Sequence, residues 1–273
     1  MNMKDVMGPA TPQPTLNRLR QTLAAIDPSN APRLAGEERL IGLIPPIDRV
    51  LGGGLACGAL HELAPVAPVH LGAASGFGVA LATRASGGRR DVLWVATDYA
   101  AGEGGGPYGP GLDLVGFASA RLLVLRVPKP VDVLWAMEEA LRCRALACVV
   151  AELTGEGNIA DLTATRRLTL AAREGISAQN SGFGLLIRHR PMSLPSAAAT
   201  RWEIAAALSE PDAYGGIGRA RFDLSLRKNR RGPSGRWIIE WDHHERTFQP
   251  AVSVGVAAAA VDRSDRAPFV RTG

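Results

Sequence analysis

The feature that most constrains the fold is an alternation of short apolar runs with longer helical segments through the middle of the chain. Apolar runs with the length of buried strands lie at 91–97, 121–126, 146–151 and 184–187. Segments with helical character lie at 73–84, 130–141 and 161–173. Strands that alternate with helices form a mostly parallel sheet with helices on both faces. The sequence therefore predicts an α/β fold.

The pattern changes toward the C-terminus. Residues 222–227 and 237–242 alternate apolar and polar side chains, and the turn-forming segment 230–235 joins them. This is the signature of an antiparallel hairpin, which we expect to extend the sheet at one edge. The Ala-rich segment 197–208, which comes before the hairpin, is predicted to be a helix.

Three regions are expected along the 273 residues. Residues 1–40 would form an N-terminal helix, at 15–26, and a linker. Residues 41–248 would form one core domain, and residues 249–273 a flexible tail. The sequence contains neither a run of ~20 apolar residues nor a start of the signal-peptide kind, so we expect a soluble, cytoplasmic protein with no membrane contact.

A nucleotide-binding domain of this class normally holds phosphate with the motif GxxxxGK[ST] after its first strand. The motif needs a lysine charge at the β- and γ-phosphates and a hydroxyl group at the magnesium ion. The chain has only three lysines, and none of them follows a glycine; they are Lys4, Lys129 and Lys228. The motif is therefore absent between residues 63 and 78, where it would fall. We predict that the chain hydrolyses no ATP and is not an enzyme.

Other motifs for cofactors or metals also fail. Gly104, Gly106 and Gly109 match GxGxxG, but Pro107 and Pro110 are expected to prevent the helix that would hold a pyrophosphate. The acidic and histidine residues at 242–245 lie along a strand, where neighbouring side chains point to opposite faces. No cofactor and no metal ion is expected.

Positive charge is concentrated in the predicted hairpin. Between residues 219 and 236 there are seven basic residues and one acidic residue, a local charge of +6 in a chain whose net charge is +5. Such a cluster suits phosphate or an acidic protein surface. The candidate binding residues are Arg219, Arg221, Arg227, Lys228, Arg230, Arg231 and Arg236. The alternative is that they are solvated charges that keep an edge strand from aggregating.

The order of these segments resembles the core of the RecA/RadA recombinases. Residues 43–55 and 58–63 are similar to the segment that leads into the recombinase phosphate loop, and 147–152 to its second nucleotide-binding strand. Residues 219–230 are similar to the recombinase strand that ends in Lys-Asn-Lys. The missing phosphate loop, together with the ending of the hairpin, looks more like the ImuA family of RecA-like accessory proteins.

This resemblance implies a role in SOS-induced, error-prone translesion DNA synthesis, that is, in DNA damage-induced mutagenesis. The implied partners are an ImuB-like Y-family polymerase homologue and RecA, an error-prone DNA polymerase indirectly, and DNA as a further candidate. The resemblance places Lys228 and Arg230 at the two lysines that reach ATP bound by a neighbouring recombinase subunit. It also places loops that face DNA or a partner near 154–160 and near Arg188, Arg190 and Arg201.

We therefore predict a non-catalytic RecA-like adaptor. Two alternatives stay open at this point. One is a divergent recombinase-type DNA-dependent ATPase, which would need a phosphate loop built without lysine. The other is a SulA-like inhibitor of cell division.

Overall fold

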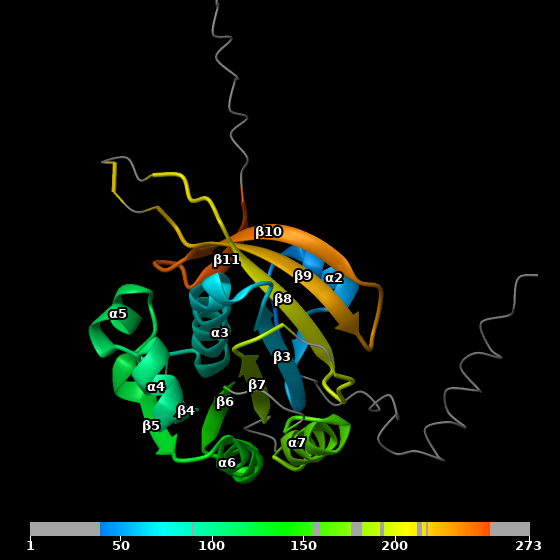
Figure 1. The fold of residues 1–273 in the computed structure, drawn as a ribbon. Helices are drawn as coiled ribbons and strands as arrows, with labels where there is room; N and C mark the ends of the chain where they lie inside the picture. The colour runs from blue at the N-terminus through cyan, green and yellow to red at the C-terminus, as the bar shows by residue number, and fades with distance from the viewer. Residues whose placement is uncertain are drawn as a thin grey trace, which may run out of the picture.

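The computed structural model describes residues 39–88, 90–154, 159–175, 182–191, 194–211, 215–216 and 218–251 (Figure 1). Its strands are β1 (Leu40–Ile41), β2 (Leu55–Ala56), β3 (Ala59–Pro65), β4 (Asp91–Thr97), β5 (Leu122–Val127), β6 (Leu146–Leu153), β7 (Phe183–Arg188), β8 (Thr200–Ala207), β9 (Arg221–Asn229), β10 (Gly235–Asp242) and β11 (Thr247–Pro250). Its helices are α2 (Pro45–Leu51), α3 (Leu71–Ser86), α4 (Asp98–Gly104), α5 (Gly109–Leu114), α6 (Pro130–Arg142) and α7 (Leu162–Glu174), with 3-10 turns η1 (Pro68–His70) and η2 (Ser119–Arg121).

One large sheet organises these elements. Its strands follow the order β11-β10-β9-β8-β3-β7-β6-β4-β5, while β1 and β2 form a separate pair. Pairing is parallel from β8 to β5 and antiparallel from β8 to β11. The predicted α/β class, with a mostly parallel sheet and a C-terminal antiparallel hairpin, is confirmed.

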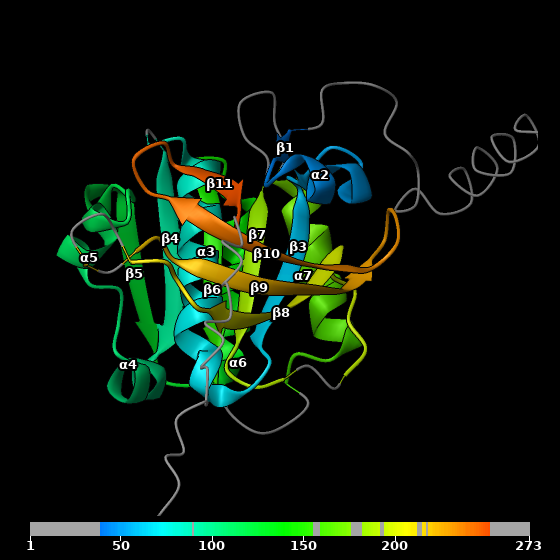
Figure 2. The same ribbon diagram turned by 90° about the horizontal axis from the view of Figure 1, so that it is seen from above.

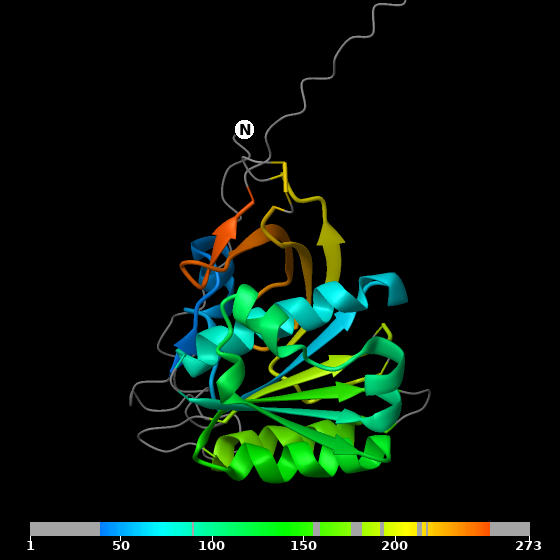
Figure 3. The ribbon, with the colours of Figure 1, turned by 90° about the vertical axis from the view of Figure 1, so that its left-hand side faces the viewer.

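Helices cover both faces of the sheet, as Figure 3 shows. Helix α3 packs on one face through Phe77 and Leu81, and α6 and α7 pack on the other through Met137 and Leu168. Helix α3 lies very close to the strands, because a Cβ atom at Gly78 would lie only 2.9 Å from the Cδ1 atom of Ile187. The sheet and its two helical layers thus enclose two separate cores.

The antiparallel strands curl over α3 (Figure 1 and Figure 2). The ring of Phe77 lies 6.3 Å from that of Trp202 on β8, 5.6 Å from Phe222 on β9 and 5.5 Å from Phe248 on β11, measured between centroids. Aromatic rings at these separations add attraction to the burial of their surface. Helix α3 is therefore held between the parallel strands and the curled antiparallel strands.

Polar groups join β3 to β8, where the parallel and antiparallel parts of the sheet meet. The Nε1 of Trp202 donates to Oγ1 of Thr200. This Oγ1 lies 2.8 Å from Nδ1 of His61, and the other ring nitrogen of His61, Nε2, lies 2.9 Å from the carbonyl oxygen of Ala56. Full burial lowers the pKa of His61 to about 4. The imidazole is therefore neutral at pH 7.

The sequence predictions for the central strands and helices are confirmed, with ends displaced by at most two residues. The predicted helix at 197–208 is wrong, because residues 200–207 form β8. Its alanines favour a helix, but Trp202 and Ile204 are buried while Arg201 and Glu203 are half-buried, which is the two-residue period of a strand. Tertiary packing decides this segment against its local propensity.

Two further differences concern short elements. Pro107 and Pro110 do not prevent a helix, since Pro110 lies in the first turn of α5, where its missing N–H costs no hydrogen bond. The GxGxxG hypothesis still fails, because α4 and not a strand leads into this segment, and α5 has only six residues. Residues 247–250 form β11, so ordered structure reaches past the point where the tail was expected to begin.

The predicted helix at 15–26 and nearly all of the predicted tail lie outside the described residues. The division of the chain into three regions remains a prediction. Within the described part of the chain, no helix has the length and apolar character that a membrane span requires.

Candidate nucleotide cleft and protein-binding surfaces

The connection from β3 to α3 is the place where a phosphate loop would lie. In the motif GxxxxGK[ST], the lysine and the hydroxyl residue begin the helix that follows the strand. Helix α3 begins at Leu71, so Leu71 and Gly72 occupy those two positions, and Pro65 and His70 occupy the glycines. The connection therefore lies where the phosphate loop would lie and has none of the side chains that bind phosphate or magnesium.

The backbone of this connection is also engaged elsewhere. A phosphate loop uses free backbone N–H groups to hold the phosphates. Here the N–H of Val66 donates to Ile204 at 3.0 Å, the N–H of His70 donates to Ala67 at 2.9 Å, and Pro68 has no N–H. Val69 is 85% exposed. A turn whose N–H groups at Val66 and His70 are already bonded thus lies where a phosphate loop would hold anions.

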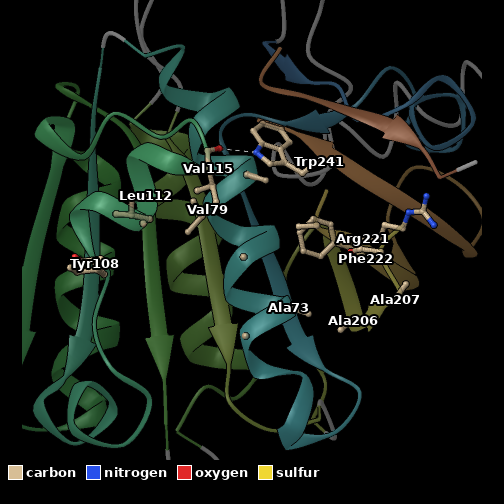
Figure 4. Close-up of a pocket in the computed structure, with 16 residues that line it drawn as sticks. Ala73, Val79, Tyr108, Leu112, Val115, Ala206, Ala207, Arg221, Phe222 and Trp241 are labelled. Carbon is tan, nitrogen blue, oxygen red and sulfur yellow. Dashed lines mark hydrogen bonds between the residues drawn. The ribbon is translucent and has the colours of Figure 1, made fainter. Parts of the chain in front are cut away.

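An apolar groove opens beside this turn (Figure 4). Its volume is about 480 Å³, and it lies between α3, α5 and the ends of β8, β9 and β10. Tyr108 and Leu112 form one wall and Phe222 another, while Trp241 donates through Nε1 to the carbonyl of Val115 at 2.9 Å. Arg221 is the one charged residue among those lining the groove, and its guanidinium already faces the carboxylate of Glu240 at 3.1 Å. The groove is therefore poorly suited to binding an anion.

Most hairpin arginines face a carboxylate. Pairs form between Arg219 and Glu240 at 3.2 Å, Arg219 and Asp242 at 2.7 Å, Arg221 and Glu240 at 3.1 Å, Arg221 and Glu210 at 3.5 Å, Arg227 and Glu203 at 3.4 Å, and Arg236 and Asp223. The acidic partners come largely from neighbouring strands. The local excess of positive charge seen in the sequence is therefore much reduced in space.

Lys228 and the two arginines that follow β9 differ from one another in burial. Lys228 is half-buried and donates through Nζ to the carbonyl of Ser196. Burial lowers its pKa, and the charges of Arg230 and Arg201 act in the same direction. Arg230 and Arg231 are exposed in the turn after β9. Of the two residues that match the recombinase lysines, Arg230 is thus exposed and Lys228 is half-buried.

The second set of candidate residues, Arg188, Arg190 and Arg201, also divides into half-buried and exposed side chains. Arg188 and Arg201 both contact the buried carboxylate of Glu62, at 2.9 Å and 2.7 Å. Arg188 also donates to the carbonyl of Ala160 at 2.8 Å. Arg190 lies on the surface just past β7, and most of the 154–160 loop lies outside the described residues. Arg188 and Arg201 therefore brace the junction of β7, β3 and β8.

The outer edge of β5 has a different character. It is the end strand of the sheet, and its side chains Leu123, Val124 and Leu125 are 52%, 47% and 39% exposed. The side of the molecule that carries β5 faces the viewer in Figure 3. An edge strand exposes unpaired N–H and C=O groups, and an apolar edge is a ready site for strand pairing. Among the described strands, β5 ends the large sheet and offers an edge on which another chain could add backbone hydrogen bonds.

Comparison with known proteins gives the family of this chain. No family model matches the chain. Proteins named ImuA from two strains of Caulobacter vibrioides, NA1000 / CB15N and ATCC 19089 / CIP 103742 / CB 15, are 32% identical to it over 219 residues. The alignment covers 75% of this chain and 81% of each relative. The chain belongs to the ImuA family.

A solved structure supports the architecture of this ImuA-family chain. The RadB recombinase matches it with a TM-score of 0.50, over 76% of this chain and 96% of that one. Sequence identity is 17%, so the match concerns the fold alone. The chain is thus a RecA-like protein of the ImuA family, in agreement with the resemblance in its sequence.

Sequence reasoning missed the groove and the exposed edge of this ImuA-family protein. The apolar run 121–126 indicates a strand, but a run of this kind looks the same in the middle and at the edge of a sheet. The groove is lined from α3, α5 and three strands that are distant in sequence. No local signal in the sequence would have found either feature.

Proposed function

We propose that this protein is a non-catalytic RecA-like adaptor in SOS-induced, error-prone translesion DNA synthesis. It would bind the ImuB-type polymerase-like partner, RecA, or both. Membership of the ImuA family supports the setting. The adaptor role rests on one observation, the β3–α3 connection without phosphate-binding groups.

This observation bears directly on catalysis. A triphosphate carries several negative charges, and phosphoryl transfer relies on cations and free N–H groups placed around them. Leu71 and Gly72 supply neither charge nor hydroxyl, and the N–H groups of Val66 and His70 are already bonded. Glu152, the last residue but one of β6, accepts a hydrogen bond from Ser75 at 3.3 Å. These contacts support a protein that does not turn over nucleotide.

The edge of β5 supplies a surface suited to an adaptor. Its unpaired backbone would accept an extended segment from a partner, and side chains on alternate positions would set the specificity. Arg126 follows the apolar residues of this edge, so an acidic side chain at that end of the segment fits best, while Arg121 already faces the carboxylate of Asp91 at 3.3 Å.

The test uses the full chain with Mg-ATP and with the ImuB-type protein and RecA of the same organism. We expect no thermal stabilisation by ATP, no hydrolysis with single-stranded DNA, and a nucleotide-independent complex with at least one of the two proteins. RecA serves as the positive control for the nucleotide measurements. Turnover of ATP stimulated by DNA would instead support the divergent ATPase, and absence of any complex would contradict the adaptor.

A further inference from the structure

The proposed adaptor function makes no use of the apolar groove between α3, α5 and the ends of β8, β9 and β10 (Figure 4). Tyr108, in one wall, is 71% exposed, and Phe222 and Trp241 line the groove from the strands. On the α3 side, a Cβ atom at Gly72 would contact nothing within 4 Å beyond its own helix. Open apolar surfaces of this kind mark sites of interaction.

The predicted helix at 15–26 has an apolar face that suits such a surface. Its apolar side chains follow helical spacing and share one side; they are Leu16, Leu19, Leu23 and Ile26. An isolated helix of about 12 residues is only marginally stable in water, so it needs tertiary contacts to persist. The apolar face therefore requires an apolar surface on which to pack.

The chain enters the described fold close to the groove. Arg39 donates through Nη2 to the carbonyl oxygen of Ala85, near the end of α3, at 2.6 Å. Gly76, which lines the groove, lies earlier on the same helix, about 14 Å from Ala85 at 1.5 Å per residue. The connection 27–38 spans up to about 40 Å when it is extended. It is therefore long enough to bring residues 15–26 to the groove.

Charges beside the groove complement those of the segment. Arg18 and Arg20 border the apolar face of the predicted helix, one on each side. Asp113 is exposed on α5, on one side of the groove. Glu210 follows β8 on another side, and its side chain is 54% exposed although it faces Arg221 at 3.5 Å. A helix that lies in the groove would thus place its two arginines near carboxylates.

Other surfaces and other occupants fit less well. Trp135 is 63% exposed, but it lies on α6, which covers the face of the sheet opposite to α3. The segment 252–261 contains no leucine, isoleucine or aromatic residue that could fill an apolar groove. A second copy would bind at its free concentration, whereas a short tether keeps a segment of the same chain at an effective concentration in the millimolar range.

We propose that the groove binds residues 15–26 of the same chain as an amphipathic helix. The leucine face packs against α3 and the ends of the antiparallel strands, which is the mode in which a groove generally receives an amphipathic helix. Arg18 and Arg20 stay at the rim, beside Asp113 and Glu210. The N-terminal segment thereby covers the largest apolar opening beside α3.

Hydrogen–deuterium exchange of the full chain, followed by mass spectrometry, tests this proposal. We expect the amides of 15–26 to exchange at least about tenfold more slowly than those of an unstructured chain. Leu19→Asp combined with Leu23→Asp puts charge on the apolar face and should abolish this protection. Asn17→Asp combined with Gln21→Asp adds the same charge to the polar face, so this matched control should keep the protection.

Variants of the folded part test where the segment binds. Ala206→Trp fills the groove from β8, and should return the exchange of 15–26 to the unprotected rate. Leu170→Trp, on α7 at the other face of the sheet, should leave the exchange unchanged. Exchange within β6 reports whether each variant is folded. Protection should be equal at about 1 µM and about 50 µM protein, because the contact lies within one chain.

Several results would overturn the proposal. They are the absence of protection in 15–26, protection that Ala206→Trp leaves unchanged in a folded protein, and protection that disappears on dilution, which would make a second copy the occupant. Protection of 252–261 alone, removed by Ala206→Trp, would assign the groove to that segment instead. The measurement contains no nucleotide and no other protein, so none of these results bears on the adaptor function.

Discussion

The two ends of the sheet differ in a way that the composition of the chain conceals. At the antiparallel end, Arg219, Arg221, Arg227 and Arg236 each face a carboxylate. At the parallel end, β5 leaves three apolar side chains and its backbone edge exposed. The antiparallel end looks like a binding surface in the sequence, but carboxylates pair with most of its arginines. The parallel end looks like buried core in the sequence, but its last strand, β5, is exposed. Recognition by this protein should therefore depend more on backbone pairing and apolar contact than on its net charge.

The largest effect is expected at the junction of the two parts of the sheet. Glu62 on β3 is fully buried between Arg188 of β7 and Arg201 of β8. Glu62→Ala would leave two guanidinium groups without their carboxylate, and we expect it to lower the free energy of unfolding by about 3–5 kcal/mol. Chemical denaturation followed by circular dichroism measures this loss.

A loss of that size approaches the ~5–15 kcal/mol that stabilises a typical domain. The triple variant Glu62→Met, Arg188→Met and Arg201→Met removes all three charges together, so it should be more stable than Glu62→Ala alone. If Glu62→Ala were as stable as the native chain, the charge cluster would not join the two parts of the sheet.

At the parallel end, the expected effect is on binding and not on stability. Replacing both Leu123 and Leu125 by Glu puts charge on the exposed edge, and should weaken the complex with the ImuB-type or RecA partner about a hundredfold, the scale of hot-spot residues. Isothermal titration calorimetry measures the affinity. Leu208→Glu, at a residue that is 94% exposed beyond β8, is the matched control and should bind normally. Equal affinity for the native chain and the β5 variant would remove this edge from the adaptor surface.

A fall in pH should destabilise the junction of β3 and β8 before it affects either end of the sheet. Burial lowers the pKa of His61 from 6.5 to about 4, so the folded protein binds this proton less readily than the unfolded chain. The stabilisation is complete above pH 6.5 and falls as the pH drops toward 4, at about 1.36 kcal/mol per unit. By pH 5 we expect a loss of about 2 kcal/mol in the free energy of unfolding.

Denaturation curves at pH 7 and pH 5 measure this dependence. His61→Gln removes the titrating group and keeps a hydrogen-bonding side chain, so its stability should change less over the same range. A native protein whose unfolding free energy were flat between pH 7 and pH 5 would contradict a buried, neutral His61.

The sequence predicts most of this fold because its strongest signals are local. The runs at 91–97 and 146–151 are apolar enough to be buried whichever strands flank them, and Pro130 marks the start of α6. The failure at 197–208 has the opposite cause. Alanine favours a helix when only neighbours in sequence are considered, but β3 and β9 pair with both edges of this segment and make it a strand.

For the candidate sites, the sequence shows which motif residues are present but not which side chains lie together. The lack of a lysine after a glycine is visible in the chain, and the structure adds that Leu71 and Gly72 begin the helix after β3. Whether an arginine is available to a ligand depends on carboxylates such as Glu62, which lies 126 residues before Arg188 and 139 before Arg201. Only the folded chain brings them together.

The smallest effect is expected within the hairpin itself. Arg227 on β9 lies 3.4 Å from Glu203 on β8, and its side chain is 64% exposed. Exposed pairs of this kind contribute about 0.2–1 kcal/mol, because water screens the charges and both side chains lose freedom. A double-mutant cycle with Arg227→Gln and Glu203→Gln, followed by denaturation, should therefore give a coupling energy below about 1 kcal/mol. A coupling energy above that value would indicate that the charged side chains of the antiparallel end are held rigidly. The hairpin arginines would then again be candidates for a preorganised surface that binds phosphate or an acidic partner.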